Sequence, residues 1–156
     1  MEMKSNNPEI VNDLIKINND RIEGYSKALS LCESLGIDDN LDRIFKKFID
    51  QSSSFIAELA PYVEHEGEET TENTKMSGKI FRWWMGVKVN TAGDSKKSLL
   101  ESCEKGEKAF RETYKKVLNE HGDELSIPVK NIIQMQLSTQ LEAQQNIKVL
   151  HQSETL

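Results

Sequence analysis

The sequence predicts an all-α protein built around a four-helix bundle, and three observations lead to that prediction. The 156 residues include only 8 glycines and 3 prolines, so few positions interrupt helix formation. Hydrophobic residues make up 37% and charged residues 29%, a balance typical of helices that each have one apolar face. Apolar residues also recur at helical spacing in four long stretches. A chain of this length fits a single domain, which we place at residues 1–156 with its core at 8–151.

The first helix is expected to run from Pro8 to Leu35. Asn7 suits the N-cap position, Pro8 suits the first helical position, and Gly36 suits the position that follows the last turn. The apolar stripe of this helix comprises Val11, Leu14, Ile15, Ile22, Tyr25, Leu29 and Cys32.

The second helix is expected to open near residues 38–39. It ends between Ala60 and Glu64, because a helix continues through Pro61 only with a kink. Its apolar stripe comprises Leu41, Ile44, Phe45, Phe48, Phe55 and Leu59.

The third and fourth long helices are also bounded by recognisable signals. Asp94 or Ser95 caps the third and Gly122 stops it, while Ser126 and Pro128 start the fourth. Their apolar stripes comprise Leu99, Leu100, Cys103, Phe110, Tyr114, Val117 and Leu118, and then Val129, Ile132, Ile133, Leu137, Ala143, Ile147 and Leu150. Short turns join the first two helices and the last two, so each pair is expected to form an antiparallel hairpin.

Residues 65–94, which join the two hairpins, are predicted to cross the full length of the bundle. A long crossover of this kind distinguishes a ferritin-like bundle from a simple up-and-down one. The crossover begins as an acidic polar loop and then contains a short fifth helix that starts at Ser77. Phe81, Trp83 and Trp84 in that helix are expected to close the bundle, or alternatively to form a surface for self-association or a partner.

Polar residues interrupt all four apolar stripes at comparable heights, where leucine would be expected in a purely structural bundle. Because buried polar groups are costly unless they hydrogen-bond, this predicted polar core layer is the most informative feature of the sequence. Its members are Asn18, Arg21, Gln51, Ser54, Glu104, Glu107, Gln136 and Gln140.

Two arrangements would satisfy such a layer. In the first, Arg21 neutralises Glu104 or Glu107, and the amides supply the remaining hydrogen bonds. In the second, carboxylates bind a pair of iron or manganese ions, as in di-iron bundles. The candidate ligands would be Glu23, Glu58, Glu101, Glu104 and Glu107. The three histidines (His65, His121 and His151) all lie away from mid-bundle, and an arginine in the layer would repel a metal, so the first arrangement and no cofactor are favoured.

Several other classes of function are disfavoured. The net charge of −6 argues against nucleic-acid binding, which requires a basic face. No stretch is long and apolar enough for a membrane helix or a signal peptide, so a cytoplasmic protein without membrane contact is expected. Cys32 and Cys103 match neither a zinc site nor a secreted disulfide framework, and no nucleophile–base pair can be argued, so an enzyme is not expected.

Several segments resemble a bacterial family of uncharacterised four-helix-bundle proteins with a ferritin-like fold. The more specific are LIKINNDRIEGY at residues 14–25 and ESCEKGE at residues 101–107. Weaker similarities lie at residues 48–59 and 78–85 and at Gln136, Ile147 and Leu150, so that the resemblance covers residues 10–151 in order. It implies the fold, a bacterial origin and a polar core, but no activity. Relatives carry a His-Asp pair where this chain has Gln144–Gln145, which further weakens the metal alternative.

The sequence therefore favours a non-catalytic structural or interaction protein with a hydrogen-bonded core layer in place of a di-metal site. Such a protein would act through its surface or as a homo-oligomer. The alternative is a metal-binding ferritin-like protein that uses the helix carboxylates.

Overall fold

The chain folds into an all-helical bundle in a computed structural model that describes residues 8–37, 40–64 and 95–153. These residues form four α-helices and a short 3-10 turn, with no strand among them, so the prediction of an all-α fold is confirmed. The elements are α1 (Pro8–Leu35), α2 (Leu41–Glu64), α4 (Ser95–His121), η1 (Gly122–Glu124) and α5 (Ile127–Ser153).

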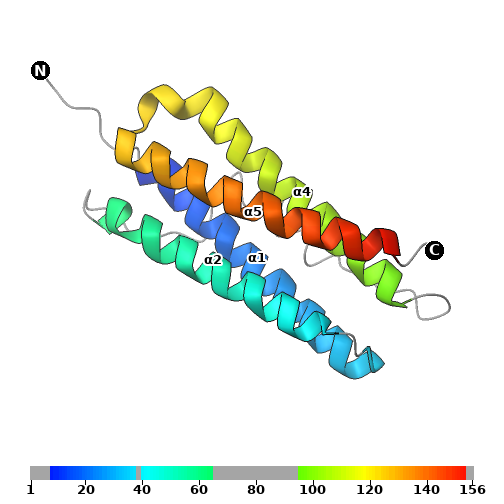
Figure 1. Cartoon of the computed structure of the whole chain (residues 1–156). Helices are drawn as coiled ribbons and strands as arrows, with labels where there is room; N and C mark the ends of the chain where they lie inside the picture. Colours follow the sequence, from blue (N-terminus) through cyan, green and yellow to red (C-terminus); the bar gives the residue numbers. More distant parts are fainter. Residues whose placement is uncertain (1–7, 38–39, 65–94, 154–156) are drawn as a thin grey trace, which may run out of the picture.

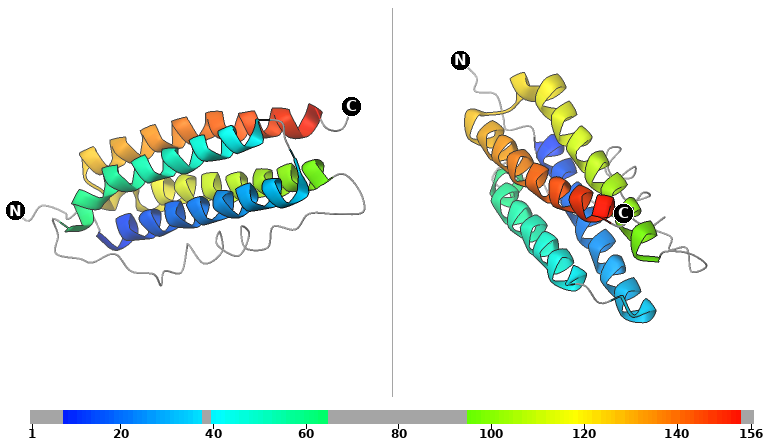
Figure 2. Two further views of the ribbon diagram at one scale, coloured as in Figure 1. Left: turned by 90° about the horizontal axis from the view of Figure 1, so that it is seen from below. Right: turned by 45° about the vertical axis from the view of Figure 1, so that its right-hand side comes forward.

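Each helix runs antiparallel to both of its main neighbours (Figures 1 and 2). Helix α1 packs against α2 and α4, and α5 packs against α4 and α2. Helices α2 and α4 therefore run in the same direction, and the end of α2 lies at the opposite end of the bundle from the start of α4. The segment between them, including the predicted fifth helix with Phe81, Trp83 and Trp84, lies outside the described residues.

The end of α1 follows directly from its sequence. Gly36 adopts a positive φ of 67°, a conformation that costs glycine little because it has no Cβ. The Ile37 N–H donates to the Cys32 carbonyl at 3.0 Å and the Gly36 N–H donates to the Glu33 carbonyl at 3.4 Å. This pair of hydrogen bonds is the Schellman motif that a glycine after the last helical turn predicts.

The start of α2 differs slightly from the prediction. The helix begins at Leu41, after Asn40, whose φ of 67° is not helical. Asparagine tolerates this left-handed conformation better than most residues do. Helix α2 then continues through Pro61 to Glu64, at the far limit of the predicted range.

The last two helices are joined closely. Helix α4 ends at His121, and Gly122 opens the short turn η1, in agreement with the predicted stop. Ser126 then caps α5, because its Oγ accepts a hydrogen bond from the Val129 N–H at 3.4 Å. Two short connections thus produce two helical hairpins whose apolar faces meet in one core.

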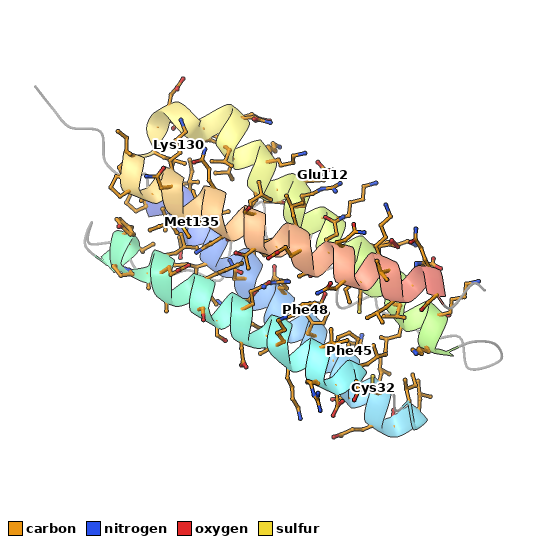
Figure 3. The ribbon with its side chains drawn as sticks, in the orientation of Figure 1. Cys32, Phe45, Phe48, Glu112, Lys130 and Met135 are labelled. Carbon is orange, nitrogen blue, oxygen red and sulfur yellow. The ribbon has the colours of Figure 1, made fainter. Side chains whose placement is uncertain are left out.

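Aromatic residues occupy the middle of that core. Tyr25 of α1 lies 5.3 Å from both Phe45 and Phe48 of α2, measured between ring centroids, and the two phenylalanines are labelled in Figure 3. Phe110 and Tyr114 of α4 stack at 4.6 Å. All five rings are buried, so they surround the polar groups described next with apolar surface.

Candidate functional site

The centre of the bundle contains a buried ion pair between Arg21 of α1 and Glu107 of α4. Both side chains are fully buried. Arg21 Nε donates to Glu107 Oε2 at 2.8 Å, and Nη2 donates to Oε1 at 3.0 Å. Two parallel charge-assisted hydrogen bonds of this kind fix the relative orientation of the two side chains as well as neutralising both charges. The pair therefore joins the two helical hairpins at one defined height.

Three further residues, one each from α1, α2 and α5, hydrogen-bond to the remaining polar atoms of this pair. The Tyr25 hydroxyl donates to Glu107 Oε2 at 2.8 Å, and Gln140 Nε2 donates to Glu107 Oε1 at 3.1 Å and to its carbonyl at 2.9 Å. On the other side, Arg21 Nη1 donates to Ser52 Oγ at 3.0 Å. We call these five residues the Arg21 cluster. The Glu107 carboxylate accepts four hydrogen bonds in all, so its lone pairs are largely occupied.

Three aromatic rings enclose the guanidinium group. Arg21 Cζ lies 5.2 Å from the centroid of Phe110, 5.5 Å from that of Phe48 and 5.7 Å from that of Tyr25. Rings at these distances attract a cation through their quadrupoles while they exclude water. The charge of Arg21 is thus accommodated by one carboxylate and three rings.

A second hydrogen-bonded group lies next to the first and also draws on all four helices. The Tyr114 hydroxyl accepts from Asn18 Nδ2 at 2.9 Å and donates to Gln136 Oε1 at 2.6 Å. Gln136 Nε2 in turn donates to Glu58 Oε1 at 2.8 Å and to the Phe55 carbonyl at 3.2 Å. We call Asn18, Glu58, Tyr114 and Gln136 the Tyr114 cluster. It extends the polar contacts from the interior to the exposed Glu58.

The protonation states of these groups follow from their surroundings. Burial is the largest single influence and lowers the pKa of the Arg21 guanidinium, but the charge and hydrogen bonds of Glu107, together with the nearby tyrosines, raise that pKa by more in total. Burial, and then the charge of Glu107, raise the pKa of Tyr25 well above its usual value. Burial also raises the pKa of Tyr114. Both tyrosines therefore keep their protons and act as hydrogen-bond donors.

Asp20 is a buried carboxyl outside both clusters. Burial raises its pKa from 3.8 to about 6, although Lys16, with Nζ at 3.5 Å from Oδ1, opposes the shift. A neutral carboxyl is therefore favoured here to a higher pH than in the unfolded chain.

Five of the residues predicted for the polar layer meet in these two clusters: Asn18, Arg21, Glu107, Gln136 and Gln140. Of the two glutamates offered as partners for Arg21, the structure selects Glu107. Glu104 is only half-buried, and its Oε2 lies 2.9 Å from Nδ1 of His151.

The predicted positions on α2 are the least accurate. Ser54 is exposed, and Ser52 takes the place expected for it inside the bundle. Gln51 is half-buried, and its Oε1 has no hydrogen-bond partner among the described residues. At 100° per residue, Ser52 lies on the same side of α2 as the apolar stripe and Ser54 lies on the opposite side, so the helical period itself favours Ser52.

Two tyrosine hydroxyls also belong to the polar core, although the apolar stripes do not indicate them. Tyr25 and Tyr114 were assigned to apolar stripes because their rings are apolar, yet their hydroxyls bond Glu107 and Gln136. A buried tyrosine generally finds a hydrogen-bond partner. Tyrosines at the same height as the polar layer therefore indicate further hydrogen-bonding groups in that layer.

The five carboxylates of the metal alternative are not brought together. Glu23 and Glu101 are exposed, and Glu101 lies 3.4 Å from Lys105. Glu58 bonds to Gln136, Glu104 lies beside His151, and Glu107 pairs with Arg21. Within residues 8–37, 40–64 and 95–153, no three histidine, cysteine, aspartate or glutamate side chains are grouped so that they could hold a metal ion.

The two cysteines are buried and free. Burial raises the pKa of both the Cys32 and Cys103 thiols, which disfavours the reactive thiolate form. None of the described helices is apolar over enough of its length to span a membrane.

The fold and its centre define a class of protein: an all-helical bundle of four long helices joined internally by a buried arginine–glutamate pair. A family model described as "Domain of unknown function (DUF2383)" matches residues 8–120, and the chain belongs to that family. The match includes α1, α2 and nearly all of α4, whereas α5 with Gln136 and Gln140 lies beyond it. No curated protein and no solved structure matches the chain.

Proposed function

We propose that this chain is a non-catalytic, ferritin-like bundle of bacterial origin, in which the Arg21 cluster replaces a di-metal site. The observation that carries the proposal is the bidentate Arg21–Glu107 pair at the middle of the bundle. A buried guanidinium repels a cation, and the carboxylate that would otherwise serve as a ligand already accepts four hydrogen bonds.

The directions of the helices support the ferritin-like assignment. Helices α2 and α4 run in the same direction, and the end of α2 lies at the opposite end of the bundle from the start of α4. A ferritin-like bundle has such a pair of ends, whereas an up-and-down bundle does not. The resemblance of residues 14–25 and 101–107 to a bacterial ferritin-like family supports the same conclusion.

In this proposal the polar core specifies how the four helices align. An apolar seam tolerates sliding by one helical turn, whereas a bidentate ion pair with hydrogen bonds to three further residues permits one alignment only. The protein would then act in the cytoplasm, through its surface, as a rigid interaction module. Two free buried cysteines fit a reducing compartment.

Elemental analysis of protein purified without chelators tests the proposal. We expect no stoichiometric iron, manganese or zinc, and no rise in melting temperature when Fe²⁺ or Mn²⁺ is added. One or two transition-metal ions per chain would overturn the proposal in favour of the metal alternative. Glu107→Gln, with Glu101→Gln as an exposed control on the same helix, would then show whether the core carboxylate is a ligand.

A further inference from the structure

The outer face of α5 carries all the large hydrophobic side chains that are exposed in the described part of the chain. Ile127 is 75% exposed, Met135 72%, Val149 51% and Leu141 41%. Met135 is labelled on α5 in Figure 3. At 100° per residue, the four positions fall within an arc of roughly 120° on the side opposite the core. They therefore form one stripe, which we call the α5 stripe, along nearly the whole helix.

Helix α5 is also nearly free of charge. Its 27 residues include three charged side chains (Lys130, Glu142 and Lys148), whereas the 27 residues of α4 include twelve. Between the hydrophobic residues, the exposed face presents one charged side chain, Glu142, and five uncharged polar ones: Asn131, Gln134, Ser138, Gln145 and Gln152. Depletion of charged residues is one of the compositional features of the core of a protein interface, and methionine is enriched there.

The α5 stripe is symmetric about Ser138. Ile127 and Val149 each lie 11 residues from Ser138, and Met135 and Leu141 each lie 3 residues from it. In a two-fold interface between antiparallel helices, a residue before the axis meets the residue that lies the same number of positions after it on the other copy, so a symmetric stripe brings apolar residues level with apolar residues. Ile127 of one copy would lie level with Val149 of the other, and Met135 level with Leu141. The small, exposed Ser138 would lie at the axis, where two helices approach most closely.

The charges on α5 are compatible with the same pairing. In an antiparallel pair centred on Ser138, Glu142 meets Gln134, Lys130 meets Asn146 and Lys148 meets Pro128. None of the three charges faces a like charge. This is significant in a chain whose net charge is −6, because two copies repel one another over most of their surface.

We propose that the α5 stripe binds a second copy of this chain, with the two α5 helices antiparallel and Ser138 at the two-fold axis. A helix of 27 residues is about 40 Å long and about 10 Å wide, so the contact would bury roughly 400 Å² on each copy. The total of about 800 Å² lies below the roughly 1,200–2,000 Å² of stable specific interfaces, so the dimer is weak and depends on concentration. The inference rests on the proposed function, since it names the partner through which that surface acts.

Sedimentation velocity of the full chain over a wide range of concentrations tests the interface. Ser138→Arg and Ser138→Glu each place two like charges at the axis, and we expect each to weaken dimerisation by about tenfold or more. An equimolar mixture of the two variants pairs opposite charges and should dimerise at least as well as the unmodified chain. Ser53→Arg, an equally exposed position on α2, is the matched control and should change nothing.

Three results would overturn the inference. The first is an unmodified chain that stays monomeric at every concentration. The second is a dimer that tolerates both Ser138 variants, or whose mixture of variants fails to recover. The third is a monomeric chain that both Ser138 substitutions destabilise, as measured by a lower melting temperature. This result would mean that another segment of the same chain covers the stripe. Each result leaves the metal analysis unaffected, so failure of the interface is distinguishable from failure of the proposed function.

Discussion

Replacing Arg21 by methionine removes the one buried cation among the described residues while leaving Glu107 in place. The substitution keeps an unbranched side chain of similar length, so packing against Phe48 and Phe110 is largely retained. The Glu107 carboxylate then keeps the bonds from Tyr25 and Gln140 but loses both bonds from the guanidinium. A buried negative charge is left without a counter-charge.

The expected loss in the free energy of unfolding follows from the burial of both Arg21 and Glu107. Breaking a fully buried pair by removing one partner costs about 3–5 kcal/mol, mainly because the other charge is left uncompensated. Glu107→Leu should cost at least as much, since it leaves Arg21 charged and also removes the acceptor of the Tyr25 hydroxyl. A domain with about 5–15 kcal/mol of total stability would lose a large part of it in either case. The melting temperature should fall by about 10 °C or more.

The double variant Arg21→Met/Glu107→Leu separates the pair from its surroundings. Both buried charges are then absent, and the remaining cost comes from the unpaired polar groups of Tyr25, Ser52 and Gln140. We expect the double variant to be more stable than the sum of the single costs predicts, by at least about 3 kcal/mol. Urea denaturation followed by circular dichroism at pH 7 gives the four free energies of the cycle.

Additive costs in this cycle would refute the reasoning, because they would mean that the two charges do not stabilise each other in the folded protein. A second readout tests the role of the pair in aligning the helices. If the Arg21 cluster specifies one alignment, the folded double variant should give a broadened or doubled amide NMR spectrum. A single sharp set of resonances would show that apolar packing alone is sufficient.

Three further outcomes are expected from equilibrium denaturation. The raised pKa of Asp20 means that the folded chain binds a proton more tightly than the unfolded chain, so stability is lost as the pH rises from about 4 to about 6, by up to about 3 kcal/mol. Asp20→Asn should remove that loss and stabilise the protein at pH 7, and an equal effect of Asp50→Asn at an exposed position would contradict the assignment. Tyr114→Phe should cost about 1–3 kcal/mol because it leaves two buried amides without their shared hydroxyl, and a cost near zero would show that the Tyr114 cluster contributes little. Glu104→Gln, at a half-buried pair, should lower the free energy of unfolding by about 1 kcal/mol or less, whereas Glu107→Gln one turn later should lower it several times more. Similar losses for the two variants would be evidence against the central place of Glu107.

The limits of the helices are largely a local property and were predictable from sequence. Pro8 and Gly36 bound α1 through their own backbone preferences, and Ser126 caps α5 with its own side chain. These effects act within one turn, so no tertiary information is needed to anticipate them. The exception is the start of α2, where Asn40 adopts a positive φ that its sequence neighbours do not require.

The presence of a polar layer was also predictable, because hydrophilic residues interrupt all four stripes at comparable heights. What a stripe specifies is the side of a helix that is buried. It does not specify the rotation of that helix or its axial offset relative to its neighbours. At 100° per residue, Glu107 lies nearer the centre of the α4 stripe than Glu104 does, but the stripe does not specify which of the two lies level with Arg21.

Only the tertiary structure decides between such alternatives. The way in which α1 packs against α4 places Arg21 level with Glu107 and leaves Glu104 near His151. The physical reason is that a hydrogen bond forms over less than about 3.2 Å, whereas a shift of one residue moves a side chain by 1.5 Å along the helix and turns it by 100°. Sequence periodicity determines that a buried polar core exists, and the packing of the four helices determines which atoms meet in it.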